Sequence, residues 1–156
     1  MVKAERLRDR HALLTGANGG IGLAVTRAFL EEGASCTAVD LPAVPGKELA
    51  ALMESHPGRL AYAQADVSQV EQTGALVDGA AQHFGTVDLL FNNAAVFDMA
   101  PLLESDAAMY ERLFSVNVKG MFFMMQAVLA RLVAAGKKGS VVNLASQAGR
   151  RGEALV

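Results

Sequence analysis

A glycine-rich segment near the N-terminus has the composition of a phosphate-binding loop. It reads Thr15-Gly16-Ala17-Asn18-Gly19-Gly20-Ile21-Gly22 and directly follows a short apolar run. Glycines let the backbone turn tightly and approach a pyrophosphate, whose charge is stabilised by N–H groups at the positive end of the next helix. No Gly-Lys-Ser/Thr follows, which excludes a P-loop, and Val25 stands where the commoner Gly-x-Gly-x-x-Gly pattern has its last glycine. A glycine-rich turn without function is the alternative to a dinucleotide site contacted by Gly16, Asn18, Gly20, Ile21 and Gly22.

An acidic residue marks the expected adenosine end of that site. Asp40 ends the second apolar run, 24 positions after Gly16, close to the ~20-residue separation of an acid that binds an adenosine ribose. A 2′-phosphate about 4 Å away would meet a repulsion of roughly 4 kcal/mol per charge pair, or nearly three decades of affinity. Gly19 and Leu41 offer no cation to offset it. Asp40 therefore predicts NAD rather than NADP, and Leu41 is expected to bind the cofactor beside it. A turn residue without such a role is the alternative for Asp40.

Apolar runs of strand length alternate with longer amphipathic stretches throughout the chain. The predicted strands are His11 to Leu14, Ser35 to Val39, Leu60 to Gln64, Val87 to Phe91 and Ser140 to Leu144. The predicted helices are Gly20 to Glu32, Gly46 to Ser55, Gln69 to Phe84 and Ser105 to Ala135, three of them ending at Gly33, Gly85 and Gly136. This alternation predicts α/β architecture: a doubly wound parallel (Rossmann) sheet of five strands, ordered 3-2-1-4-5, in one dinucleotide-binding domain over residues 1–156.

Three motifs in order resemble the short-chain dehydrogenase/reductase family. They are the glycine pattern of Thr15 to Gly22, the Asp66-Val67 pair after the third strand and Asn92-Asn93-Ala94-Ala95 after the fourth. The resemblance implies that Asp66 and Val67 hold the adenine and that Asn92 and Ala94 flank the adenosine ribose and stabilise the central strands. Ala95 stands where the family usually has glycine, which affects only local packing, because a methyl group fits where φ stays negative.

Asn117 lies with Lys119 and Gly120 inside an otherwise apolar helix. Asn and Gly lower helix propensity, so the sequence predicts a local kink whose freed carbonyl could hold a water. A tolerated core asparagine is the alternative. The resemblance implies that Asn117 belongs to the proton relay.

Ser146 follows the fifth strand, at the edge of the sheet where such folds bind ligands. It resembles the family's catalytic serine, whose hydroxyl would steady a developing alkoxide or carbonyl oxygen as an oxyanion-hole donor does. A serine that only satisfies its loop is the alternative. The stretch from Gln147 to Val156 further resembles bacterial polyol dehydrogenases of the sorbitol type.

The family's chemistry also needs a tyrosine as general acid/base and a lysine four residues later. The only tyrosines, Tyr62 and Tyr110, are followed four positions on by Asp66 and Phe114, so the chain has no Tyr-x-x-x-Lys. We therefore expect an NAD-dependent alcohol dehydrogenase, acting on a small alcohol or ketone, whose sequence here is truncated before the last strands and inactive alone. A non-catalytic dinucleotide-binding or regulatory module is the alternative.

Composition and charge narrow the other partners. A formal net charge of -2 gives no broad attraction to nucleic acid. The most apolar run, Met121 to Ala135, is broken by Gln126 and Arg131, so no membrane span is expected. A charged N-terminus and a single cysteine, Cys36, favour a cytoplasmic location, and no metal-ligand spacing is present. The Met- and Phe-rich helix before the fifth strand predicts a homo-oligomer.

Overall fold

The computed structural model describes residues 5–151 and contains one five-stranded, wholly parallel sheet. Its order is β3-β2-β1-β4-β5, as predicted. The strands are β1 (His11–Thr15), β2 (Ser35–Asp40), β3 (Leu60–Gln64), β4 (Leu89–Asn92) and β5 (Ser140–Asn143). The central strand β1 pairs with β2 from His11↔Ser35 to Thr15↔Val39 and with β4 from Ala12↔Leu89 to Leu14↔Phe91. This register brings the carboxyl ends of all five strands to one edge of the sheet.

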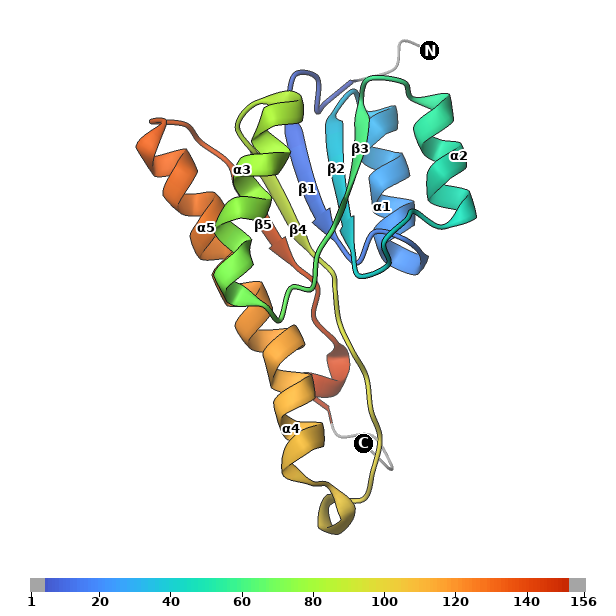
Figure 1. The fold of residues 1–156 in the computed structure, drawn as a ribbon, viewed down its shortest axis with the longest axis vertical. Helices are drawn as coiled ribbons and strands as arrows, with labels where there is room; N and C mark the ends of the chain where they lie inside the picture. Colours follow the sequence, from blue (N-terminus) through green and yellow to red (C-terminus); the bar gives the residue numbers. More distant parts are fainter. Residues whose placement is uncertain (1–4, 152–156) are drawn as a thin grey trace.

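Helices cover both faces of this sheet (Figure 1). They are α1 (Gly20–Glu31), α2 (Lys47–Ser55), α3 (Thr73–Phe84), α4 (Ala107–Phe114) and α5 (Met121–Ala134). Because side chains alternate along β1, Leu14 packs in the cluster with α1 and α2, whereas Leu13 packs in the cluster with α3 and α5. The doubly wound prediction is confirmed.

The ends of the elements differ from the predicted ones by a few residues. The strand expected over Val87 to Phe91 is Leu89–Asn92, and the helix expected from Ser105 begins at Ala107. The latter start is local chemistry, because the Asp106 side chain accepts a hydrogen bond from the Met109 N–H at 2.7 Å and so caps the helix. The third helix opens with a 3-10 turn, Val70–Gln72. Gly33, Gly85 and Gly136 all have positive φ, as expected for helix-terminating glycines.

The long helix is interrupted in its middle by a π-helical segment, Ser115–Gly120. This confirms the predicted irregularity around Asn117. Gly120 allows the helix to approach the third βα loop, since a Cβ there would lie 2.7 Å from the Val67 carbonyl oxygen. At the other end of the helix, Arg131 makes two 2.8 Å hydrogen bonds to Asp78 and so ties α5 to α3.

This helical run bears on the expected absence of a membrane span. When α4, the π-helical segment and α5 are counted as one helix, Ala107–Ala134 meets the length and composition of a membrane span, and 22% of its most apolar window is buried. The sequence-based expectation considered only Met121 to Ala135, because it did not add the residues before the π-helical segment. Core helices of globular domains pass the same test, and one face of α5 packs on the sheet through Met124, Val128 and Leu132.

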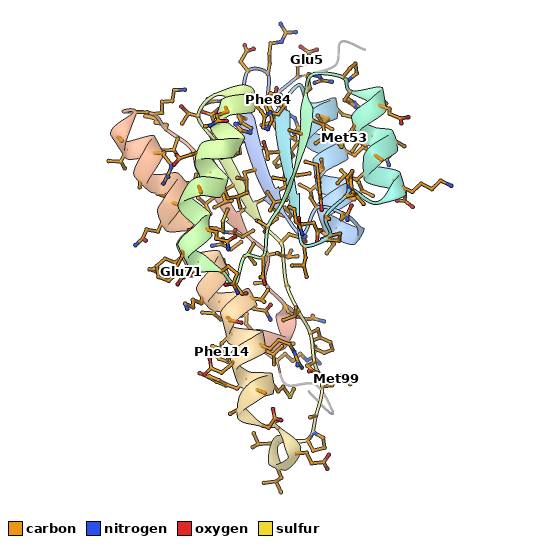
Figure 2. The ribbon with its side chains drawn as sticks, viewed as in Figure 1. Glu5, Met53, Glu71, Phe84, Met99 and Phe114 are labelled. Atoms are coloured by element: carbon orange, nitrogen blue, oxygen red, sulfur yellow. The ribbon has the colours of Figure 1, made fainter. Side chains whose placement is uncertain are left out.

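The segment after β4 and helix α4 extend together beyond the carboxyl ends of the strands (Figures 1 and 2). Figure 2 shows Met99 on this segment and Phe114 on α4. An ion pair between Asp98 and Arg112 joins the two. Many apolar side chains here and on α5 are exposed, among them Phe97, Leu102, Leu103, Phe122 and Val133.

Candidate functional site

The glycine-rich loop forms the junction between β1 and α1. Gly16 and Gly20 have φ values of +63° and +52°, a region that side-chain-bearing residues rarely adopt. A Cβ on Gly16 would lie 2.8 Å from Ala94 Cα, so this glycine permits close approach of the loop that follows β4. The N-cap of α1 is Gly19, which has no side chain with which to cap the helix. The positive end of this helix can therefore receive an anion.

Two residues that the sequence-based prediction missed hold this loop in place. The Asn93 side-chain amide donates to the carbonyl oxygens of Thr15 at 3.0 Å and Gly16 at 2.8 Å. The Thr15 hydroxyl oxygen accepts from the backbone N–H groups of Asn93 and Ala94, each at 3.0 Å. The repeated asparagine after β4 was the available signal, but the prediction chose Asn92.

Asp40 lies at the carboxyl end of β2 with its carboxylate held at both oxygens. Oδ2 accepts from the Asn18 N–H and Oδ1 from the Leu41 N–H, each at 2.8 Å. Each oxygen keeps a further lone pair, so the carboxylate can accept from ribose hydroxyls as well. The acid is thus fixed in position before any ligand arrives.

A cavity of about 340 Å³ opens beside Asp40. It has the dimensions of a small-molecule pocket. Six of the predicted cofactor residues line this cavity, namely Gly16, Asp40, Leu41, Asp66, Val67 and Ala94. Asn93, Ala95 and Val96 also line it. Asp66 also shapes its own turn, because Oδ1 accepts from the Ser68 N–H at 2.9 Å.

The remaining predicted cofactor residues lie outside this lining. Asn18, Gly20, Ile21 and Gly22 belong to the loop and the first turn of α1. Asn92 is buried, and its amide donates to Asn143 Oδ1 at 2.9 Å, which links the ends of β4 and β5. The structure therefore places Asn93, and not Asn92, against the cavity beside Asp40, because consecutive residues at a strand end point in different directions.

A second cavity, of about 670 Å³, adjoins the first and contains both predicted catalytic residues. Residues 93–96 line both cavities. Ser146 lies on its wall after β5, and its Oγ accepts from the Ala148 N–H at 3.1 Å. The hydroxyl hydrogen stays available to donate to an oxygen in the cavity. Apolar side chains complete the wall, among them Phe97, Val118, Met121 and Leu144.

Asn117 approaches this cavity from the π-helical segment. Its Oδ1 accepts from the Val96 N–H at 2.9 Å, and its Nδ2 donates to the Val96 carbonyl oxygen at 2.8 Å. The side chain thereby fixes the segment that separates the two cavities. A proton-relay role through its backbone carbonyl stays a prediction.

The two tyrosines do not line either cavity. Tyr62 donates to the Pro42 carbonyl oxygen at 2.6 Å, and burial, followed by the nearby Asp40 charge, raises its pKa. Tyr110 stacks on Phe114 with ring centroids 4.2 Å apart. His11 is buried, with Nδ1 2.8 Å from the Gly85 carbonyl oxygen, and burial lowers its pKa. Within residues 5–151, no three His, Cys, Asp or Glu side chains are grouped so that they could hold a metal ion.

The sheet order and the glycine-rich loop at the carboxyl edge define an α/β domain of the doubly wound class. A family model described as short chain dehydrogenase matches residues 10–156, and the chain belongs to that family.

Similar proteins include several sugar-alcohol dehydrogenases. The galactitol 2-dehydrogenase of Agrobacterium fabrum is 44% identical over 152 residues, which are 97% of this chain and 58% of that protein. The sorbitol dehydrogenase of Cereibacter sphaeroides is 43% identical over 151 residues, with the same coverage. A crystal structure titled short-chain dehydrogenase/reductase, glucose/ribitol dehydrogenase, from Brucella melitensis has a TM-score of 0.83 at 33% identity, covering 96% of this chain and 62% of that one. The chain thus spans somewhat more than half the length of these relatives.

Proposed function

We propose that this protein contributes the cofactor-binding half of an NAD-dependent oxidoreductase that interconverts a secondary alcohol of a polyol and the corresponding ketone. The observation that carries the proposal is the junction of the two cavities at residues 93–96, with Asp40 in one and Ser146 in the other. The similarity to galactitol and sorbitol dehydrogenases supports a polyol as the substrate class.

The residues present fit a dinucleotide. Gly16 and Gly22 pack too closely to carry side chains, and the uncapped α1 N-terminus adjoins them. In the proposed arrangement this loop would hold the pyrophosphate and Asp40 the adenosine ribose, while Asp66 and Val67 flank the adenine. Bound NAD would supply the hydride acceptor. The fixed negative charge of Asp40 favours NAD over NADP, because a 2′-phosphate would be repelled.

Ser146 would bind the substrate oxygen. Its Oγ is oriented by the Ala148 N–H, so its remaining hydrogen can be donated to the oxygen on which negative charge develops. Asn117 would keep the Val96 segment in place between cofactor and substrate. Removal of the carbinol proton needs a general base, and residues 1–156 contain no Tyr-x-x-x-Lys. We therefore propose that these residues do not turn over an alcohol by themselves.

The test is a chimera that joins residues 1–156 to the C-terminal part of the Agrobacterium fabrum galactitol 2-dehydrogenase. NAD reduction is followed at 340 nm with galactitol, sorbitol and a primary alcohol as the control substrate. Polyol-dependent NAD reduction that is lost in Ser146→Ala supports the proposal. A folded chimera that binds NAD and oxidises no polyol would favour a non-catalytic dinucleotide-binding module.

Two further proposals concern the oligomeric state of the protein and its location in the cell. The exposed apolar side chains of α4 and α5, such as Phe114 and Phe122, support a homo-oligomer. The single cysteine, Cys36, is buried and unpaired, which is consistent with the proposed cytoplasmic location.

A further inference from the structure

The side chain of Asn18 connects the glycine-rich loop to the segment that follows β2. Its Oδ1 accepts from the Gly46 N–H at 2.5 Å, 28 positions along the chain. Its own N–H donates to Asp40 Oδ2 at 2.8 Å. Asn18 does not line the cavity beside Asp40. The oxygen of this side chain is thus engaged within the protein, outside the lining of that cavity.

The connected segment, residues 41–46, is fastened by polar contacts on both flanks. From β3, Tyr62 donates to the Pro42 carbonyl oxygen at 2.6 Å, and the Gln64 amide donates to the Leu41 carbonyl oxygen at 3.2 Å. Leu41 and Val44 are 61% and 69% exposed, so apolar burial does little to hold the segment. On the side of the glycine-rich loop, the hydrogen bond from the Gly46 N–H to Asn18 Oδ1 holds the segment.

The position of this segment determines what surrounds the Asp40 carboxylate. Leu41 lines the cavity and its N–H donates to Asp40 Oδ1, so movement of residues 41–46 would alter both the wall and the acid. Gly46 is also the N-cap of α2, and Lys47 follows it. The Gly46 N–H at the positive end of this helix and the Lys47 ammonium are groups that could stabilise a 2′-phosphate. Asn18 already occupies that N–H.

We propose that Asn18 is a positioning residue for nucleotide selection. Its hydrogen bond from the Gly46 N–H, called the latch below, holds residues 41–46 in place and prevents this N–H from donating to a 2′-phosphate. The inference rests on the proposed NAD-binding function. It assigns NAD selectivity to a second residue, whose side chain acts through the surroundings of Asp40. Opening the latch adds a cost of ordering residues 41–46 when NAD binds.

The first variant is Asn18→Ala in the 156-residue protein, with NAD and NADP titrated by calorimetry at fixed ionic strength. NAD affinity should fall about five- to tenfold, the equivalent of one hydrogen bond. NADP affinity should stay within about twofold, because the loss of ordering is offset by the released Gly46 donor. The ratio of the two dissociation constants should therefore narrow about five- to tenfold. An unchanged ratio would overturn the proposal.

Hydrogen exchange of the Gly46 amide tests the latch without any nucleotide. This amide should be protected in the unmodified protein and in Asn18→Asp, which keeps an acceptor oxygen at the same position. It should exchange at least tenfold faster in Asn18→Ala. Equal protection in Asn18→Ala would show that the side chain does not hold the segment, and would refute the latch.

A matched variant removes the donor in place of the acceptor. Gly46 has φ −64°, which proline adopts, so Gly46→Pro deletes this N–H and keeps the local backbone angle, and its ring also displaces Asn18 Oδ1, since a Cβ at this position would lie 3.1 Å from that oxygen. Because this variant has no N–H left to stabilise a 2′-phosphate, the affinities for NAD and NADP should both fall about five- to tenfold, and the ratio of the two dissociation constants should stay unchanged. In the double variant, NAD affinity should fall no further than in Gly46→Pro alone. Additive effects in the double variant would contradict a shared contact. If the unmodified protein binds neither nucleotide, the proposed function fails, whereas the exchange measurement still decides the latch.

Discussion

Gly22→Ala tests whether close packing of the glycine-rich loop sets both stability and nucleotide binding. Gly22 is buried in the first turn of α1, and a Cβ on it would collide with its nearest neighbour, the Gly16 carbonyl oxygen, and would lie 2.7 Å from Asn93 Nδ2 and 2.8 Å from the Gly16 carbonyl carbon. The closer of these distances is about 0.7 Å inside the 3.4 Å at which ordinary contact begins. Since backbone is involved, the loop or the Asn93 amide must move.

Two terms set the expected cost of this displacement. Overpacking a tight site costs about 1–3 kcal/mol. Disturbing the 2.8 Å hydrogen bond from Asn93 to the Gly16 carbonyl oxygen adds about 1 kcal/mol. For a domain of this size, about 2–4 kcal/mol corresponds to a fall in Tm of roughly 5–12 °C. NAD affinity should fall at least about tenfold, because the loop amides no longer meet the pyrophosphate at hydrogen-bond distance.

The same loop supplies two matched controls. A Cβ on Gly19 meets nothing within 4 Å and its φ of −167° suits any residue, so Gly19→Ala should cost only about 0.5–1 kcal/mol, the lower preference of alanine for an N-cap. A Cβ on Gly20 also meets open space, but its φ is +52°, so Gly20→Ala should cost about 1–2 kcal/mol of backbone strain. Thermal unfolding by circular dichroism ranks the three variants. If Gly22→Ala unfolds within 2 °C of Gly19→Ala, the packing argument is refuted.

Four further outcomes follow from the described contacts and from the sequence. Ser146→Ala in the chimera should lower kcat roughly 10²- to 10³-fold with unchanged NAD affinity, as expected for one oxyanion donor, and a retained kcat would leave Ser146 as a loop residue. Asp40→Ala should narrow the preference for NAD over NADP by about one to two decades in affinity, because the half-buried carboxylate is partly screened by solvent. Equal affinities for the two nucleotides in the unmodified protein would contradict the role assigned to Asp40. Burial lowers the pKa of His11 below its unfolded value, so its contribution to stability is complete above pH ~6.5 and is lost as the pH falls from there through the lower pKa of the folded state. His11→Gln should flatten the pH dependence of the free energy of unfolding, and an unaltered slope would contradict this. Residues 1–156 alone should reduce no NAD with polyols. They should also elute larger than a monomer, because β5 pairs only with β4 among residues 5–151 and leaves an open edge beside Val142, which is 51% exposed. A monomer that oxidises sorbitol would mean that another base replaces the tyrosine.

The sequence by itself determined the class of fold and the place of the glycine-rich loop. Strand-length apolar runs, amphipathic stretches and terminating glycines are local signals, and right-handed crossovers restrict how such elements assemble. The predicted strand order and the glycine helix ends are therefore confirmed. The irregularity at Asn117 was also foreseeable, because Asn and Gly weaken a helix wherever they stand.

Only the tertiary structure decided which side chains meet. Asn92 and Asn93 are neighbours of one type, and the register between β1 and β4 brings Asn93 to the glycine-rich loop and turns Asn92 toward Asn143. Asn117 fastens a residue 21 positions away, and Asn18 one 28 positions away. Contacts of this kind leave no periodic trace in the sequence, because they depend on how distant loops converge at the carboxyl edge of a parallel sheet.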